Sequence, residues 1–115
     1  MNKSDTTVNY IIVTDHFGNK TWYKKCNSYN EYHREDAPAF EGVNGDKEYW
    51  VNDQLHRIDG PAVEYADGEK QWFVNDIRHR IDGPAVIWAD GNVEYWINGK
   101  RYSSLEEGLM DQAIG

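Results

Sequence analysis

The chain has few of the residues that would indicate a disulfide scaffold or a membrane span. Cys26 is the single cysteine among 115 residues, so no intrachain disulfide can form, and a reducing compartment is the simplest context. No apolar run reaches the roughly 18 residues that a spanning helix needs. Residues 1–7 are polar and lack the apolar region of a signal peptide. We therefore expect one soluble, cytoplasmic domain.

Basic side chains are also scarce. The chain has 12 Lys and Arg against 20 Asp and Glu, which gives a net charge of −8. Nucleic-acid binding through phosphates needs clustered Lys and Arg, so we expect no direct nucleic-acid partner. An anionic membrane surface is disfavoured for the same reason. Basic proteins, or protein sites that normally receive nucleic acid, are the favoured partners.

A repeated heptapeptide dominates what the chain does contain. The segment His56-Arg57-Ile58-Asp59-Gly60-Pro61-Ala62 returns unchanged at 79–85, and a looser copy occupies 33–39. The three copies begin 23 residues apart. A fixed period of this length is typical of repeat architectures, in which each repeat is one supersecondary unit.

Two turn signals in each repeat indicate two hairpins. The first signal is Asn-Gly or Asp-Gly, which favours a two-residue primed turn because both central residues need positive φ. The second is Asn-Asp or Asn-Gly, eight residues later, and the flanks are rich in β-branched and aromatic residues. We predict an all-β fold, a curved antiparallel meander of about eight strands. Equivalent residues would then lie roughly 10 Å apart, which is two strand spacings.

The two ends of the chain depart from the regular repeat. Residues 1–8 look like a polar, frayed start, and 10–32 like a degenerate half repeat in which 24–32 form an irregular loop. The repeats proper are 33–55, 56–78 and 79–102. A cap at 103–115 is predicted to be a short helix, because Ser104 and Glu107 have capping-box spacing. Leu105, Leu109 and Met110 would share the helix face that covers the last repeat or part of the sheet.

The pattern Trp-x-x-Asn-Gly, His-x-x-x-Gly and Asp-Gly at a 23-residue period resembles the MORN repeat. It is carried here by Asp67-Gly68, Trp72-Phe73, Asn75-Asp76, His79 and Gly83. The usual MORN core has His-Gly-x-Gly where this chain has His-Arg-Ile-Asp-Gly-Pro-Ala, so the resemblance is to a variant repeat. Such variants are found in bacteria, phages and large DNA viruses. The resemblance implies a β-hairpin array that serves as a protein-interaction or scaffolding surface, and the acidic charge argues against the phospholipid binding linked to some arrays.

The recurring His, Arg and Asp side chains could be metal ligands, acid–base groups or structural residues. Copies roughly 10 Å apart cannot converge on one ion whose ligands lie about 2 Å from it, and catalysis normally needs one unique constellation. We expect structural roles, with each Arg paired to an Asp and each His bonded to a turn carbonyl. We expect no enzyme activity, no metal and no cofactor, and Cys26 has no evident base beside it. The structural set is His33, Arg34, Asp36, His56, Arg57, Asp59, His79, Arg80 and Asp82.

Two hypotheses of function follow from the remaining residues. The first is a non-enzymatic protein-binding module with an aromatic sheet face, because aromatic anchors dominate interface energetics. The second is a small acidic phage or viral inhibitor of a host defence or nucleic-acid-binding protein, acting by charge mimicry. A homodimer is compatible with both, because the sheet should have unpaired edges. The aromatic set is Tyr65, Trp72, Trp88 and Trp96, and the acidic set is Asp46, Glu48, Glu64, Asp67 and Glu69.

Overall fold

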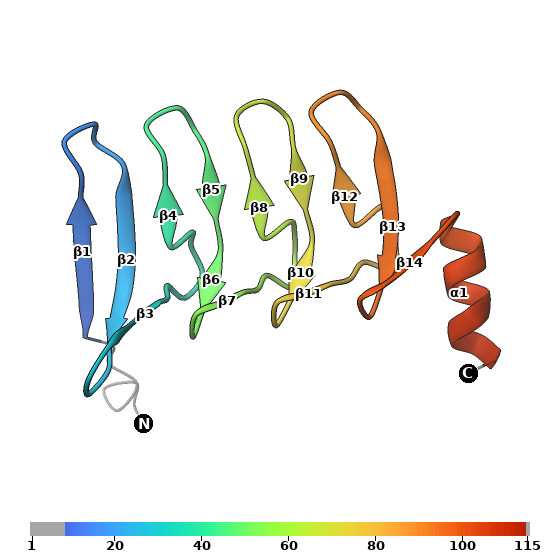
Figure 1. The fold of residues 1–115 in the computed structure, drawn as a ribbon, viewed down its shortest axis with the longest axis horizontal. Coiled ribbons are helices and arrows are strands. Elements are labelled where there is room, and N and C mark those ends of the chain that lie inside the picture. Colours follow the sequence, from blue (N-terminus) through green and yellow to red (C-terminus); the bar gives the residue numbers. More distant parts are fainter. Residues whose placement is uncertain (1–8, 115) are drawn as a thin grey trace.

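A computed structural model describes residues 9–114, so the predicted polar start at 1–8 lies outside the described residues. Paired strands stand side by side in chain order, and one helix lies at the C-terminal end of the row (Figure 1). Fourteen strands and the helix make up the described chain. They are β1 (Tyr10–Thr14), β2 (Lys20–Lys25), β3 (Asn30–Tyr32), β4 (Phe40–Glu41), β5 (Lys47–Glu48), β6 (Trp50–Val51), β7 (Gln54–Leu55), β8 (Val63–Glu64), β9 (Lys70–Gln71), β10 (Phe73–Val74), β11 (Ile77–Arg78), β12 (Val86–Ile87), β13 (Val93–Ile97), β14 (Lys100–Tyr102) and α1 (Leu105–Ile114).

All strand pairings are antiparallel, so the predicted all-β meander with a short C-terminal helix is confirmed. The main sheet runs β1-β2-β4-β5-β8-β9-β12-β13-β14, and β3 pairs with β2. The pairs β6-β7 and β10-β11 form small separate sheets. The structure has more strands than the predicted eight because the longer strands are interrupted, so that each is divided into two short ones. Between β5 and β6, for example, the Tyr49 N–H donates to the Ala62 carbonyl of the next unit, at 2.7 Å.

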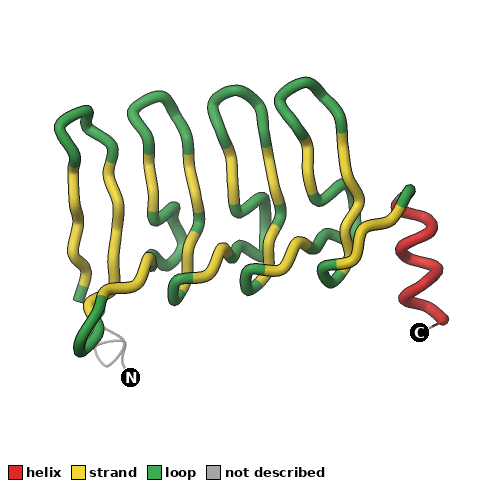
Figure 2. Tube along the Cα trace, in the orientation of Figure 1, coloured by secondary structure: helices red, strands yellow, loops and turns green. Residues whose placement is uncertain are grey.

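Each unit therefore has an upper hairpin in the main sheet and a lower hairpin below it (Figure 2). The upper loops are not the predicted two-residue primed turns. In the loop at Asn44-Gly45, only Gly45 has positive φ, at 102°. Its N–H donates to the Gly42 carbonyl at 3.0 Å, and the Gly42 N–H donates to Asp46 at 2.8 Å. This is a three-residue loop, a type I turn followed by a left-handed glycine.

The primed geometry occurs in the lower turns instead. Asn52 and Asp53 have φ of 49° and 67°, and Asn75 and Asp76 have φ of 50° and 68°. Asn and Asp tolerate the left-handed region better than other side chains, because their short polar groups bond locally. The Asn-Gly, Asp-Gly and Asn-Asp dipeptides predicted the positions of both turns correctly. They did not predict the turn type, which differs between the three-residue upper loops and the two-residue lower turns.

The prediction of an irregular loop at 24–32 was wrong. β2 continues to Lys25 and pairs with β3, so that Tyr23 lies opposite Tyr32. In the next unit Trp50 lies opposite Leu55 in the same way. Segment 10–32 thus contains both hairpins of a unit, with a longer lower turn in which the Cys26 N–H donates to the Tyr29 carbonyl.

The core is thin, and small side chains occupy its tightest places. Ala39, Ala62 and Ala85 are completely buried, and Val86 and Ile97 are the largest fully buried side chains. Each alanine links two strands: the Ala39 N–H donates to Glu48, and the Ala39 carbonyl accepts from the Trp22 N–H.

Helix α1 begins with the predicted Ser104 cap, but the helix face that packs against the last unit is not the predicted one. Ser104 Oγ accepts from the Glu107 N–H at 3.1 Å, and the Glu107 carboxylate accepts from Ser103 rather than Ser104. The predicted packing face was wrong, because Leu109 and Met110 are exposed and Gly108 is the buried residue. The helix contacts β13 and β14 at the end of the row (Figure 1). Within the described chain, no helix has the length and apolarity to cross a bilayer.

Gly108→Leu should detach the helix from the last unit. A Cβ at position 108 would lie 2.8 Å from Ile97 Cδ1 and 3.0 Å from Tyr102 Cδ2. We expect the free energy of unfolding to fall by about 1–3 kcal/mol, as measured by urea denaturation followed by circular dichroism. The control Ala113→Leu, on the exposed side of the same helix, should change it by less than about 0.5 kcal/mol. Equal stability of both variants would contradict the close packing at Gly108.

Candidate functional site

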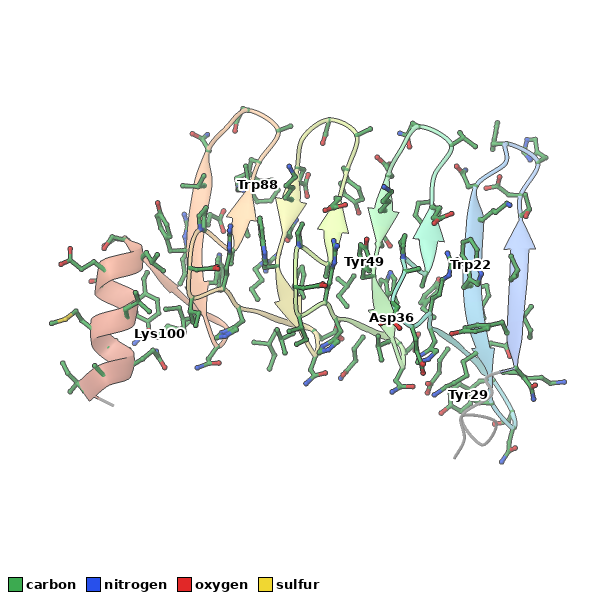
Figure 3. The ribbon with its side chains drawn as sticks, turned by 180° about the vertical axis from the view of Figure 1, so that it is seen from behind. Trp22, Tyr29, Asp36, Tyr49, Trp88 and Lys100 are labelled. Carbon is green, nitrogen blue, oxygen red and sulfur yellow. The ribbon has the colours of Figure 1, made fainter. Side chains whose placement is uncertain are left out.

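The His-Arg-x-Asp-Gly-Pro-Ala segments, called the linkers from here on, connect each unit to the next. The guanidinium of each linker arginine lies over an aromatic ring of the preceding unit. The distance from the guanidinium carbon to the ring centroid is nearly constant along the row. It is 3.8 Å for Arg34 over Trp22, 4.0 Å for Arg57 over Tyr49 and 3.9 Å for Arg80 over Trp72. Trp22 and Tyr49 lie at mid-height in the row, between the upper loops and the lower turns (Figure 3).

Each arginine is also held by hydrogen bonds to its own linker and to the strand that follows it. The Nη1 of Arg57 donates to the Pro61 carbonyl at 3.1 Å and to Glu64 at 3.3 Å, and its Nε donates to Asp59 at 3.3 Å. Arg80 makes the equivalent bonds to Asp82 and to Pro84, at 2.9 and 3.0 Å. A guanidinium that is stacked and bonded along its edge has little freedom left. The arginines are therefore parts of a rigid linker.

The first linker differs because it has Ala37 where the others have glycine. A Cβ at Gly60 or Gly83 would lie 2.9 or 2.7 Å from the arginine Cζ of that linker. At the first linker Asp36 has a φ of 64°, and Arg34 pairs with Glu41 at 3.3 Å, as Arg57 does with Glu64. The prediction that each linker arginine pairs with an aspartate thus holds for Arg57 and Arg80 and was wrong for Arg34. The glycine before proline thus makes room for the guanidinium, which the sequence pattern alone did not reveal.

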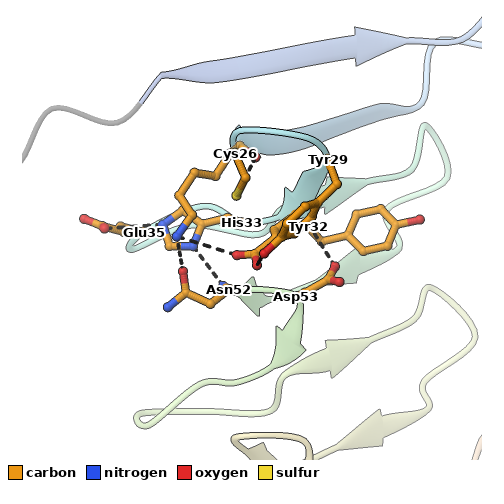
Figure 4. A network of polar contacts seen from close by, with 9 residues as sticks. Cys26, Tyr29, Tyr32, His33, Glu35, Asn52 and Asp53 are labelled. Atoms are coloured by element: carbon orange, nitrogen blue, oxygen red, sulfur yellow. Dashed lines mark hydrogen bonds and ion pairs between the residues drawn. The ribbon is translucent and has the colours of Figure 1, made fainter.

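The prediction that each His bonds a turn carbonyl was wrong. The Nδ1 of His33 accepts a hydrogen bond from the Asn52 N–H at 2.9 Å. His56 and His79 accept equally from Asn75 and Asn98, at 3.0 Å. The left-handed conformation of the asparagine leaves its N–H without a partner in the hairpin, and the imidazole supplies one. The side-chain Nε2 of His33 also contacts Glu35 at 3.3 Å (Figure 4).

The lower turns bind the preceding unit by a second repeated contact. Asp53 accepts from the Tyr32 N–H through its carboxylate at 3.1 Å, and donates its own N–H to the Tyr32 carbonyl at 2.8 Å (Figure 4). Asp76 makes the same pair of bonds with Leu55, at 2.9 and 2.8 Å. Linkers and lower turns together fix the spacing of the units.

The four aromatic residues of the first hypothesis are half-buried and are bonded within the chain. Trp72 lies under Arg80. The Tyr65 hydroxyl donates to Glu48 at 2.7 Å, and burial followed by this hydrogen bond raises the pKa of Tyr65. Trp88 and Trp96 both donate their indole N–H groups to Glu94, at 2.9 and 2.8 Å. Trp72 thus supports the third linker, and the other three side chains are bonded to glutamates of the strands.

The two indole hydrogen bonds also act on Glu94 itself. The bonds from Trp96 and Trp88, in that order, hold the pKa of the Glu94 carboxyl below its usual value. Glu94 therefore joins the upper and lower hairpins of the last unit. Its role was not predicted from the sequence.

The five acidic residues of the second hypothesis do not gather on one face. Glu48 pairs across the strands with Val63 and Glu64 pairs with Lys47, so the two carboxylates point to opposite faces of the sheet. Glu64 also lies between Lys47 and Lys70 on neighbouring strands. The other three acidic side chains are also hydrogen-bonded within the chain. Asp46 accepts from the Ala66 N–H, Asp67 from the Glu69 N–H, and Glu69 from the Gln71 amide.

The third residue of each linker lies on the surface, and its importance was missed from the sequence. Ile58 and Ile81 are 75% and 58% exposed, and the carboxylates beside them, Asp59 and Asp82, are almost fully exposed. A cleft of about 710 Å³ lies between the first and second linkers, and one of about 670 Å³ between the second and third. Ile58 lines both clefts. The signal available in the sequence was an isoleucine at the third linker position, where the first copy has Glu35.

In residues 9–114, no three His, Cys, Asp or Glu side chains gather in a way that could hold a metal ion. No protein-family model, no curated protein and no solved structure matches this chain. The linker face, meaning Ile58, Asp59, Ile81, Asp82 and the two clefts beside them, is thus the main surface feature that repeats with the fold.

Gly83→Ala should disturb the third linker. The added Cβ would lie 2.7 Å from Arg80 Cζ and would push the guanidinium away from Trp72. We expect a loss of about 1–3 kcal/mol in the free energy of unfolding, measured by urea denaturation. The reverse change at the equivalent position, Ala37→Gly, should alter stability by no more than about 1 kcal/mol. A Gly83→Ala variant as stable as the natural chain would rule out this role of the glycine.

Glu94→Gln should weaken the last unit, because an amide offers a single acceptor oxygen to two indole donors. We expect a loss of about 1–2 kcal/mol at neutral pH, seen as a lower midpoint of thermal unfolding by tryptophan fluorescence. Since folding lowers the pKa of Glu94, its contribution is present above the ordinary value of 4.5 and disappears as the pH falls through the folded pKa. The difference between the two proteins should therefore shrink in acid.

The exposed Glu106→Gln, in the first turn of α1, serves as the control and should change stability by only a few tenths of a kcal/mol, or about 0.5 at most. A constant difference between Glu94→Gln and the natural chain from neutral pH into acid would show that the carboxylate charge has no part in the effect.

Proposed function

We propose that this chain is a non-enzymatic protein-binding module of the cytoplasm, and that the linker face is its binding surface. The observation that carries the proposal is the pair of equivalent clefts, each rimmed by an exposed isoleucine and an exposed aspartate. Exposed apolar side chains beside a concave surface are typical of protein-interaction sites.

The chemistry of the linker face defines the partner. Apolar side chains of a partner would enter the clefts beside Ile58 and Ile81, and its Lys or Arg side chains would meet Asp59 and Asp82. The two anchor points would be roughly 10 Å apart, since two strand spacings separate equivalent residues. The partner would therefore present apolar groups at that interval with basic groups between them.

The rigidity of the linkers supports this assignment. Arg57 and Arg80 are stacked and hydrogen-bonded, so the loops that carry the isoleucines are already ordered before binding. A pre-organised surface loses less conformational entropy on association. Of the aromatic set, Trp72 contributes to binding through this support, and the four half-buried rings are not exposed anchors. The resemblance to MORN-type arrays is in keeping with such a scaffolding role, and we retain it as a proposal.

A second candidate is the acidic inhibitor that mimics nucleic acid, of phage or viral origin. It is favoured by the strong excess of acidic residues beyond position 34, where 17 Asp and Glu face 7 Lys and Arg. It is less well supported by geometry, because Glu48 and Glu64 point to opposite faces and both are bonded within the chain. The two candidates differ in salt dependence, since screening weakens charge mimicry far more than apolar contact.

The test is affinity capture with the tagged chain from its cell of origin, analysed by mass spectrometry. The double variant Ile58→Asp/Ile81→Asp should lose the captured partner at least tenfold, because charged groups would replace both anchors. The matched control Val43→Asp changes an equally exposed residue of an upper loop and should retain the partner. Capture should also survive high salt. A partner that the control loses equally, or that salt alone removes, would contradict the linker face as the site.

A further inference from the structure

The first strand of the sheet has an outer edge to which no other strand of residues 9–114 is paired. The hydrogen bonds between β1 and β2 show which backbone N–H and C=O groups of β1 point away from the sheet. The Lys25 N–H donates to Asn9 and the Asp15 N–H donates to Asn19, so odd-numbered residues of this strand face β2. Residues alternate in an antiparallel pair, and the N–H and C=O groups of Tyr10, Ile12 and Thr14 therefore point away from the sheet.

The side chains of β1 give this edge none of the usual protection. The strand Tyr10-Ile11-Ile12-Val13-Thr14 has no charge and no proline, and Ile12 and Val13 are about half exposed. Ile12 lies opposite Trp22, and in the second unit the equivalent position is Ala39, which is completely buried between two strands. Uncharged, straight edge strands pair readily with other strands.

We propose that β1 pairs with β1 of a second copy of this chain, antiparallel and about a two-fold axis through Ile12. In this register, Ile12 bonds Ile12 of the second copy, and Tyr10 bonds Thr14 of the second copy on both sides of the axis. All outward N–H and C=O groups of the strand are then paired. Ile11 lies opposite Val13 of the second copy, a β-branched pair that suits a sheet. The result is one continuous sheet through both copies.

The distribution of charge favours this end for self-association. Residues 1–34 have five Lys and Arg and three Asp and Glu, whereas residues 35–115 have seven and 17. Pairing through β1 brings the least acidic parts of the two copies together and keeps the acidic parts apart. Contact through the linker faces would instead place Asp59 and Asp82 against one another, which like-charge repulsion opposes.

The opposite end of the sheet offers no equivalent strand for head-to-tail growth. Helix α1 lies there (Figure 1), and β13 pairs with β14 as far as Tyr95 with Tyr102. Assembly should therefore stop at two copies. A single five-residue strand from each copy buries little surface, so the dimer should be weak, with a dissociation constant on the order of micromolar or above.

Sedimentation equilibrium of the full chain, from micromolar to near-millimolar concentration, tests the proposal. The natural chain should pass from monomer to dimer with no larger species. Ile12→Lys should be monomeric throughout, because two like charges would meet at the axis. Ile114→Lys makes the same charge change on the exposed surface of α1 and should dimerise like the natural chain.

Two variants of opposite charge at position 12 test the proposal even if each is less stable than the natural chain. Ile12→Lys and Ile12→Glu should each be monomeric alone, and an equimolar mixture should form a heterodimer. A natural chain that stays monomeric, species larger than two copies, or an Ile12→Lys dimer would each overturn the proposal. So would a dimer that forms only after residues 1–8 are removed, since that segment would then be what fills the edge. None of these results depends on the linker face.

Discussion

The stacking of each linker arginine on a ring of the preceding unit is the interaction on which the structure depends. Arg34, Arg57 and Arg80 are each shared between two units, because the ring belongs to one unit and the guanidinium leads into the next. The same arginine bonds the proline carbonyl that begins the next strand. A single unit would therefore leave both its ring and its strand edge without a partner. Stability comes from contacts between neighbours, as in other repeat proteins.

A thin core follows from this arrangement. The sheet buries alanines, a few β-branched residues and the rings of Phe73 and Tyr102, whereas its tryptophans are only half-buried. Hydrogen bonds and ion pairs supply part of the stability that a thicker apolar core would give. Glu94, for example, accepts from two indole N–H groups, and His56 accepts from a turn amide. These are local bonds that repeat along the row. The ends of the row then become the places where pairing is incomplete, and within residues 9–114 a helix packs on the C-terminal end alone.

The same constraint shapes the surface that is left for function. In the repeated linkers, the His and Arg side chains and some of the Asp side chains are bonded to other groups of the chain. These side chains are therefore spread along the row and do not gather at one site. The linker isoleucine is exposed beside a cleft in two consecutive units. Repetition thus favours a surface with several equivalent anchor points. Such a surface suits a partner with matching periodicity.

The sequence by itself determined the repeat, the antiparallel hairpins and the helix with its Ser104 cap, because each depends on residues close together in the chain. It also indicated the structural role of the recurring His and Arg. Only the tertiary structure decided that Asn52 donates to His33, that Gly83 makes room for Arg80 above Trp72, and that Gly108 is the buried residue of the helix. It also decided which apolar side chains stay exposed, Ile58 rather than Tyr65. The physical reason is that turns and caps are set by local backbone preferences, whereas burial and stacking depend on a neighbouring unit whose position the local pattern does not contain.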